Sequence, residues 1–164
     1  MPDLIQLTDR SDVTPALRRG LIDCWTEVTG GGTGLAPVLD AIITRLHPDR
    51  ERLLLALSGA ALTGWVTLTR DPNPLITHWG SVNHLQTRPS HRKRGVGTAL
   101  MTRLHRIARE EMHLDQLHLA ARGGLGLEHF CSRLGWREAG RWPKALHLGP
   151  NERQDEVLMV LSPL

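Results

Sequence analysis

Residues 85–100, LQTRPSHRKRGVGTAL, are the most informative segment of the sequence, because they join a predicted strand to a predicted helix through a basic turn that contains glycines. Gly95 and Gly97 allow a tight turn without side chains, so the first amides of the following helix can point at an anion. The helix dipole adds to that attraction, which suits a diphosphate. The third glycine of a dinucleotide-binding fingerprint would fall at Leu100, and the Gly-Lys-Ser/Thr ending of a nucleoside-triphosphate loop is absent, so both of these alternatives are weakened.

On both sides of this turn, the spacing of apolar residues predicts a mixed α+β domain. Thr14 is expected to cap a first helix that starts at Pro15. Further helices are predicted over 38–46, 96–108 and 127–134, and strands over 52–58, 61–69, 76–88, 114–121, 136–142 and 156–161. The order ααβββαβαββ contains an antiparallel meander followed by one βαβ crossover.

Length and composition indicate a single globular domain over residues 1–164, since 40% of the 164 residues are hydrophobic and 23% are charged. Cys24 and Cys131 can form at most one bridge, so a reducing compartment is expected. The sequence has no leader-like N-terminus and no apolar run near the ~18 residues of a membrane span, so we expect a cytoplasmic protein that does not bind membranes. The glycine-rich residues 30–34 are expected to form a mobile loop.

The net charge of +3 is small, but its distribution is uneven. From Arg88 to Arg109 the chain has seven cations and no acid, which predicts either a polyanionic ligand nearby or a solvated basic face. Nucleic acid is a weaker candidate for that ligand, because aromatic residues are not interleaved with the cations.

Two segments resemble a known family. The pattern Arg92-x-x-Gly95-x-Gly97, after a strand and before an amphipathic helix, resembles the acyl-CoA-binding motif of the GNAT superfamily of N-acyltransferases. Residues 130–136, FCSRLGW, are similar to the family's Phe-Tyr-Glu-Lys-Leu-Gly-Phe segment, and the element order matches over nearly the whole chain. The glycine loop and residues 140–143 look most like the tabtoxin-resistance type of small-molecule acetyltransferase. The implied fold is a mostly antiparallel sheet, splayed between its fourth and fifth strands and flanked by helices.

The resemblance implies that acetyl-CoA is the acyl donor and implies how it would bind. Leu85, Gln86 and Thr87 would form a β-bulge that splays the fourth strand from the fifth and presents main-chain groups to pantetheine. Backbone amides of the basic turn would hold the pyrophosphate, through Arg92, Lys93, Arg94, Gly95, Val96, Gly97 and Thr98. The cations that would face phosphates are Arg88, Lys93, Arg94 and Arg103.

Catalytic residues are harder to assign, because the family's usual acid is a tyrosine and this chain has none. Cys131 aligns with that tyrosine, and its thiol, with an ordinary pKa near ~8.5, could protonate the CoA thiolate. The alternative is that Cys131 is a small buried residue and that water or nothing fills the role. His84, just before the expected bulge, is the first candidate for the general base, with chance placement as its rival. His78, Ser81 and Glu27 are weaker candidates.

The acceptor site is expected under two loops that Trp25 and Trp142 flank, with Glu27 near the end of the first helix. Simple packing is the alternative for both tryptophans. No metal is expected, because the histidines follow no metal-ligand spacing, and His105 and His113 fit helix-surface positions.

The resulting hypothesis is an acetyl-CoA-dependent N-acetyltransferase that acts on a primary amine of a small molecule by direct attack in a ternary complex, as a monomer or homodimer. A covalent acetyl-Cys131 intermediate is a weaker option, because spacing assigns it no partner histidine. The missing tyrosine keeps open a second class, an acyl-CoA-binding sensor or accessory domain that has lost catalysis. The sequence leaves open the identity of the acceptor and the length of the acyl group.

Overall fold

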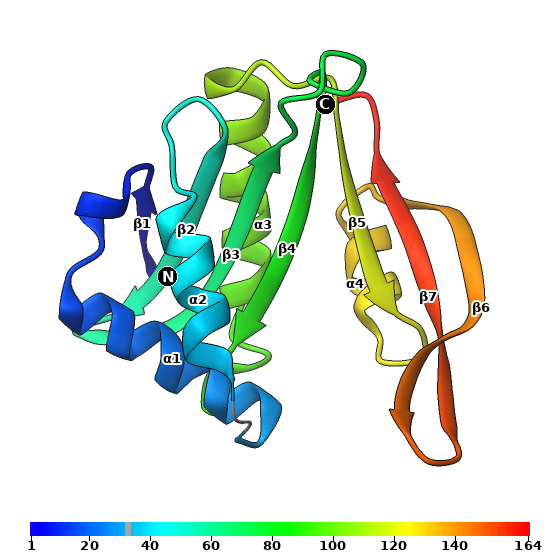
Figure 1. The fold of residues 1–164 in the computed structure, drawn as a ribbon, viewed down its shortest axis with the longest axis horizontal. Coiled ribbons are helices and arrows are strands. Elements are labelled where there is room, and N and C mark those ends of the chain that lie inside the picture. The colour runs from blue at the N-terminus through cyan, green and yellow to red at the C-terminus, as the bar shows by residue number, and fades with distance from the viewer. Residues whose placement is uncertain (32–33) are drawn as a thin grey trace.

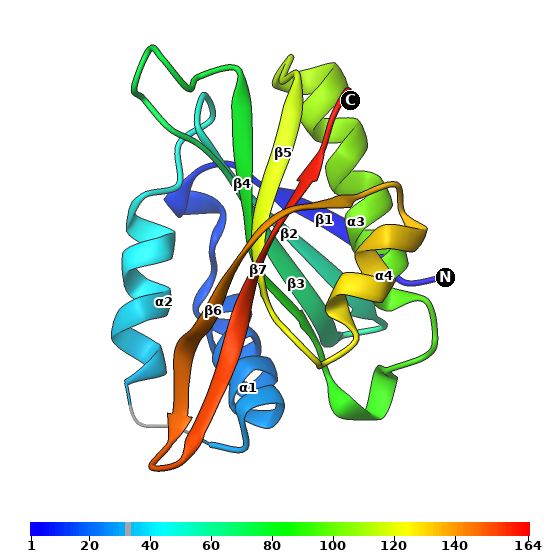
Figure 2. The same ribbon diagram turned by 90° about the vertical axis from the view of Figure 1, so that its right-hand side faces the viewer.

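The computed structural model describes residues 1–31 and 34–164, in which a mostly antiparallel sheet lies between two layers of helices (Figures 1 and 2). The predicted glycine loop includes residues 32 and 33, which lie outside the described residues. The helices and strands are β1 (Asp3–Leu7), α1 (Pro15–Thr29), α2 (Leu35–Thr44), β2 (Glu51–Ser58), β3 (Ala61–Arg70), β4 (Trp79–Thr87), α3 (Val96–Arg106), β5 (Gln116–Arg122), α4 (Leu127–Arg133), β6 (Arg137–Gly149) and β7 (Glu152–Leu161).

The described strands form one sheet in the order β1-β2-β3-β4-β5-β7-β6. Neighbouring strands are antiparallel except β4 and β5, which run parallel and are connected through α3. The predicted α+β class, the meander and the single βαβ crossover are therefore confirmed. Figure 2 shows α1 and α2 on one side of the sheet and α3 and α4 on the other.

The first helix begins and ends where its local sequence predicts. The side chain of Thr14 accepts a hydrogen bond from the Leu17 amide (3.1 Å), Pro15 occupies the first turn, and the helix ends at Gly30 in the left-handed conformation (φ 76°). The buried face of α1 contributes Leu21 and Trp25 to a core that includes Trp65 of β3. This core fixes α1 and α2 over the first three strands.

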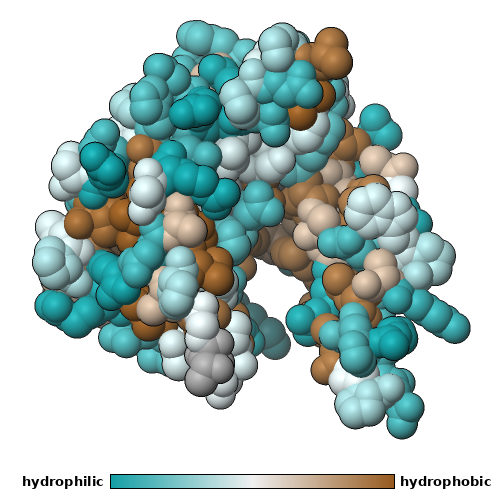
Figure 3. Space-filling model, in the orientation of Figure 1, coloured by the Kyte–Doolittle hydropathy of each residue, from teal (hydrophilic) through white to brown (hydrophobic). Residues whose placement is uncertain are grey.

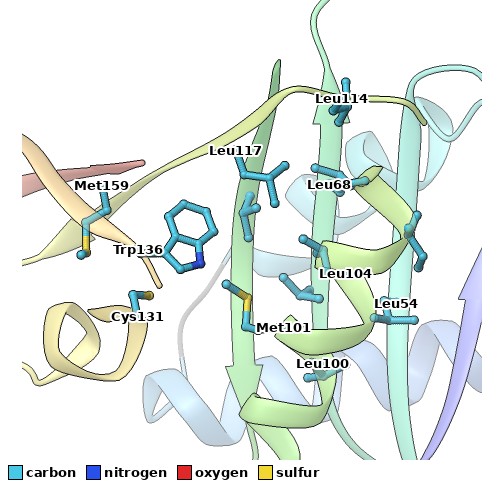
Figure 4. Packing of buried hydrophobic residues seen from close by; sticks show 14 of the residues in the cluster. Leu54, Leu68, Leu100, Met101, Leu104, Leu114, Leu117, Cys131, Trp136 and Met159 are labelled. Carbon is cyan, nitrogen blue, oxygen red and sulfur yellow. The ribbon is translucent and has the colours of Figure 1, made fainter. Parts of the chain in front are cut away.

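On the opposite face of the sheet, α3 supplies the larger core (Figure 4). Leu100, Met101 and Leu104 of α3 are buried against the sheet, and Trp136 lies in the same cluster. Trp136 Nε1 donates a hydrogen bond to His105 Nε2 (3.1 Å), so the expectation that His105 is a surface residue is wrong. The helical spacing of α3 does not show that Trp136, which lies between α4 and β6, packs against His105.

Three strand predictions need correction. The sequence does not predict β1, because this edge strand has only five residues and its alternation of more and less exposed residues is too short to recognise. The closing hairpin is longer than predicted, since β6 continues past Pro143 to Gly149 and β7 starts at Glu152. Register shifts in this pairing accommodate the proline and the left-handed Lys144 (φ 53°). β4 starts at Trp79 rather than at residue 76. None of the described helices has the length and apolarity needed to span a membrane.

Candidate active site

The turn before α3 presents unpaired amides, as predicted. Gly95 caps the helix in the left-handed conformation (φ 81°), and the first helical hydrogen bond runs from the Ala99 amide to the Gly95 carbonyl (2.9 Å). Within the described chain, the amides of Val96, Gly97 and Thr98 form no hydrogen bond. Lys93 is also left-handed (φ 60°), which curls the backbone before the helix. Such a turn at a helix N-terminus makes a concave site for an anion.

Two glycines allow the elements around this turn to approach closely. A Cβ on Gly97 would lie 3.4 Å from Phe130 Cζ and 3.8 Å from Thr87 Oγ1, so the start of α3 lies between α4 and the end of β4. A Cβ on Gly64 of β3 would lie 2.6 Å from the Gln86 carbonyl oxygen and 2.9 Å from Val96 Cγ1. Only glycine at position 64 lets β4 and α3 sit this close to β3. The sequence gives no clear sign of this role for Gly64, because one glycine inside a strand is a weak signal.

β4 and β5 separate soon after they pair. Their register contains Trp79 with Gln116, Gly80 with Leu117 and Ser81 with His118, and the strands diverge beyond this point (Figure 1). The gap holds a cavity of about 250 Å³, lined by residues that include the predicted Leu85 and Gln86. The predicted splay is therefore confirmed, and it leaves the edge of β4 that faces β5 without a strand partner beyond Ser81.

The bulge lies slightly earlier than predicted. Trp65 pairs with Gln86, but Thr67 pairs with Asn83, so β4 contains one residue more than β3 across this interval. The extra residue falls at His84 and Leu85, and His84 has a positive φ of 57°. The expectation that residues 85–87 form the bulge, with His84 before it, is corrected: His84 is part of the bulge.

His84 lies against two tryptophans. Its ring stacks on Trp65 (centroids 5.6 Å apart, planes 17° apart) and meets the edge of Trp25 (5.3 Å, 67°). It also lines the cavity between β4 and β5. Burial lowers the pKa of His84, and the positive charge of Arg45 lowers it further, so the imidazole is neutral at pH 7 and can accept a proton. The structure thus brings Trp25 and His84 together, although Trp25 itself is buried.

The basic segment divides into paired and unpaired cations. Arg88, expected to face phosphates, instead forms an ion pair with Glu27 and donates from Nε to the Leu62 carbonyl (2.6 Å). Arg103 pairs with Glu111 (3.5 Å). Glu27 is 61 positions from Arg88, and Glu111 lies just beyond the window that ends at Arg109, so counting charges inside that window overstated the basic surface.

Three cations of the turn remain available for an anion. Arg92, Lys93 and Arg94 are exposed next to the free amides of α3, and they form no ion pair with any described residue. Arg92 Nε makes one long hydrogen bond, to the Thr87 carbonyl (3.4 Å). The local positive charge is therefore concentrated at the helix N-terminus, as the motif predicts.

Cys131 lies in the core rather than at the cavity surface. Its side chain is fully buried in the cluster that contains Trp136 and Met159 (Figure 4). Burial raises the pKa of the Cys131 thiol to about 11. This position favours the packing role over the role of acid, since a proton donor to CoA would have to reach the reacting sulfur.

The other predicted acceptor residues lie on opposite sides of the gap between the two halves of the sheet (Figures 1 and 3). Glu27 is on α1 and is held by Arg88, and Trp142 is on β6 with 56% of its surface exposed. Figure 3 shows hydrophobic side chains inside the gap. Neither Glu27 nor Trp142 lines the cavity between β4 and β5 or the larger cavity beside it.

A second, larger cavity of about 510 Å³ adjoins the first, and both are lined by Val82, Asn83, Leu119 and Ala120. The weak candidate Ser81 lines the larger cavity, whereas His78 lines neither. Trp79, His118 and Arg137 also line it, although no sequence pattern indicates them. These residues come from three strands and form no motif, so only strand pairing brings them together. The described residues contain no group of side chains arranged to hold a metal ion.

Comparison with known proteins agrees with this geometry. Residues 15–136 match the model of the acetyltransferase (GNAT) family. Among curated protein sequences, none is similar enough to this chain to count as a match.

Solved structures share the fold at low identity. A GNAT-family acetyltransferase from Streptococcus pneumoniae is 17% identical, with a TM-score of 0.75 over 96% of this chain and 98% of that one. The ribosomal-protein-S18-alanine N-acetyltransferase from Escherichia coli is 12% identical, with a TM-score of 0.79 over 99% and 94%. An aminoglycoside 6′-N-acetyltransferase complexed with coenzyme A is 16% identical, with a TM-score of 0.74 over 98% and 96%. The last two names give different acceptors, a ribosomal-protein alanine and an aminoglycoside, so the shared fold does not select one.

Proposed function

Because the chain belongs to the acetyltransferase (GNAT) family, we propose that it transfers an acetyl group from acetyl-CoA to a primary amine of a small molecule, by direct attack in a ternary complex. One observation carries this proposal: the amides of Val96, Gly97 and Thr98 are free at the head of α3, and Gly97 lies beside Thr87 at the end of β4. A diphosphate at those amides would allow the pantetheine arm to extend along the unpaired edge of β4. We also infer that residues 1–164 act as one domain, since one sheet carries both cores.

Charge supports this placement of the donor. Arg92, Lys93 and Arg94 surround the helix N-terminus and would add charge-assisted contacts to the phosphates. Leu85 and Gln86 line the cleft between β4 and β5 and would flank the pantetheine arm. Thr87, beside Gly97, would stand at the phosphate end of the cleft.

The chemical step requires a proton acceptor and a polarised carbonyl. The amine nitrogen would attack the thioester carbon, so that an N–C bond forms and the C–S bond breaks. Neutral His84, at the cleft, is the group we propose to take the proton released by the nitrogen. A main-chain amide on the free edge of β4 would stabilise the oxyanion. The CoA thiolate would take its proton from solvent, because the Cys131 thiol is buried.

Free-thiol release from acetyl-CoA with a panel of primary amines tests this function. We expect at least one amine to be acetylated, with a matching amount of CoA produced. Tight CoA binding, measured by calorimetry, without turnover across a broad panel would instead support the sensor class that the missing tyrosine left open. Absence of CoA binding would contradict both. The likeness to the tabtoxin-resistance type stays a prediction that identification of the acceptor would test.

A further inference from the structure

The larger cavity differs in charge from the basic turn. It lies mainly on the face of the sheet opposite α3, where Ser81, His118 and Val160 face it while Leu117, next to His118, is buried towards α3. Val82, Leu119 and Met159 of the α3 cluster also line it. Among its described lining residues, Arg137 is the one with a permanent charge. Burial lowers the pKa of His118, with a further effect from His78, so His118 is neutral at pH 7.

No acidic residue lines either cavity in the described part of the chain. Glu138 and Asp155 are both held by Arg141, at 2.8 and 3.1 Å. Glu156 shares a strand face with Leu158 but lies outside the lining. A polycationic acceptor would therefore bind without a carboxylate partner and next to a guanidinium, which is unfavourable.

The remaining walls are mostly apolar, with Ser81, Asn83 and Gln116 as neutral polar exceptions. The Trp79 and His118 rings stack with centroids 3.9 Å apart and planes 18° apart. Leu158 and Val160 of β7 lie along the same cavity. Its volume of about 510 Å³ is in the range of small-molecule sites.

Building on the proposed acetyl transfer, we infer that this cavity binds the acceptor, and that the acceptor is an amine with a flat or apolar body and a carboxylate that pairs with Arg137. A planar guanidinium matches a carboxylate with two parallel hydrogen bonds. The same arrangement assists the reaction, because a nearby positive charge and the lack of a carboxylate on the protein both favour the neutral, nucleophilic form of the amine.

Calorimetry on the CoA-saturated protein tests this inference with three probes of one shape: 3-phenylpropionate, 3-phenylpropanol and 3-phenylpropylamine. We expect the carboxylate to bind about tenfold or more tightly than the alcohol or the amine. Arg137→Gln should remove that advantage and leave the affinity for the alcohol unchanged. Arg19→Gln, an exposed arginine of α1 outside both cavities, should keep the advantage.

Equal affinity for the three probes, preference for the ammonium probe, no binding of the carboxylate, or an unchanged Arg137→Gln variant would each overturn the acceptor class. Titration with CoA alone separates this result from the proposed function. If CoA binds and the carboxylate preference is missing, only the acceptor class fails. If CoA does not bind, the proposed function fails.

Discussion

His84 and His105 are both partly buried histidines with a lowered pKa, but their neighbours differ. His84 faces a cavity and two tryptophan rings, so its lone pair can meet a substrate. His105 accepts the hydrogen bond of a core tryptophan, which requires that its Nε2 stays unprotonated. His84 is thus free to accept a proton from a substrate, whereas the ring nitrogen of His105 is used in a hydrogen bond of the core.

His84→Asn tests the proposed base, because asparagine tolerates the left-handed backbone of this bulge. We expect kcat to fall by about 10² or more, the usual contribution of a general base. The profile of kcat/KM against pH should also lose the inflection below about pH 6.5 that a histidine of lowered pKa produces. An unchanged profile would exclude His84 as the base. The near-UV circular dichroism of the variant, which reports packing around Trp25 and Trp65, is the control for folding.

The His105 hydrogen bond predicts a pH dependence of stability. Burial lowers the pKa of His105 to about 4, whereas the unfolded value is near 6.5. The unfolded state therefore binds the proton more tightly, so the stabilisation is complete above about pH 6.5 and is lost as pH falls to about 4, by at most about 3 kcal/mol. Urea unfolding across this range should show the decrease.

A non-titrating acceptor provides the matched comparison. His105→Gln should flatten the dependence between about pH 6.5 and 4, because glutamine can accept from Trp136 Nε1 at both ends of the range. His129→Gln, an exposed histidine of α4, should keep the wild-type slope. Equal slopes in all three proteins would show that His105 titrates normally.

At the scale of elements, α3 combines a packed body with an unpaired N-terminus. Leu100, Met101 and Leu104 bury the helix, while Gly95 caps it without a side-chain hydrogen bond. The approach of α3 to β3 at Gly64 places its first turn beside the end of β4. The burial of Leu100, Met101 and Leu104 therefore holds the free amides of the first turn of α3 in place.

Gly97→Trp should block the anion site, because a side chain there points into the space between Phe130 and Thr87. We expect CoA binding by calorimetry to fall at least about 100-fold, since the free amides at the head of α3 would be covered. Thr102→Trp, at an exposed position of the same helix, should bind CoA as the wild type does. Unchanged affinity in Gly97→Trp would refute the assignment of this turn to the pyrophosphate.

At the scale of the whole molecule, two halves of one sheet meet through three residue pairs between β4 and β5 and diverge beyond them (Figure 1). Residues of both strands line the two cavities. A ligand that contacts both strands adds binding energy only to the folded state. CoA should therefore stabilise the molecule as a whole.

Thermal unfolding tests this coupling. CoA at 100 times its Kd should add about 2.7 kcal/mol to the free energy of unfolding. For a chain of this size that corresponds to a rise in Tm of about 5 to 10 °C. The Gly97→Trp variant should show no rise at the same CoA concentration, and an equal rise in both proteins would place CoA elsewhere.

The sequence alone determined the features that depend on neighbouring residues. Thr14 and Pro15 start α1, and Gly95 and Gly97 shape the anion turn, because capping and turn formation are local effects. Short apolar runs bounded by turn residues predict the inner strands β2 and β3. The edge strand β1 escaped prediction because five residues give too short a pattern.

Which charges and polar groups meet depends on tertiary packing. Arg88 forms an ion pair with Glu27, which is 61 positions away in the sequence, and Trp136 donates a hydrogen bond to His105, which is 31 positions away. The larger cavity likewise combines Trp79, His118 and Arg137 from three strands. The physical reason is that burial, pKa and charge pairing depend on which distant segments pack together, and no local pattern encodes that pairing.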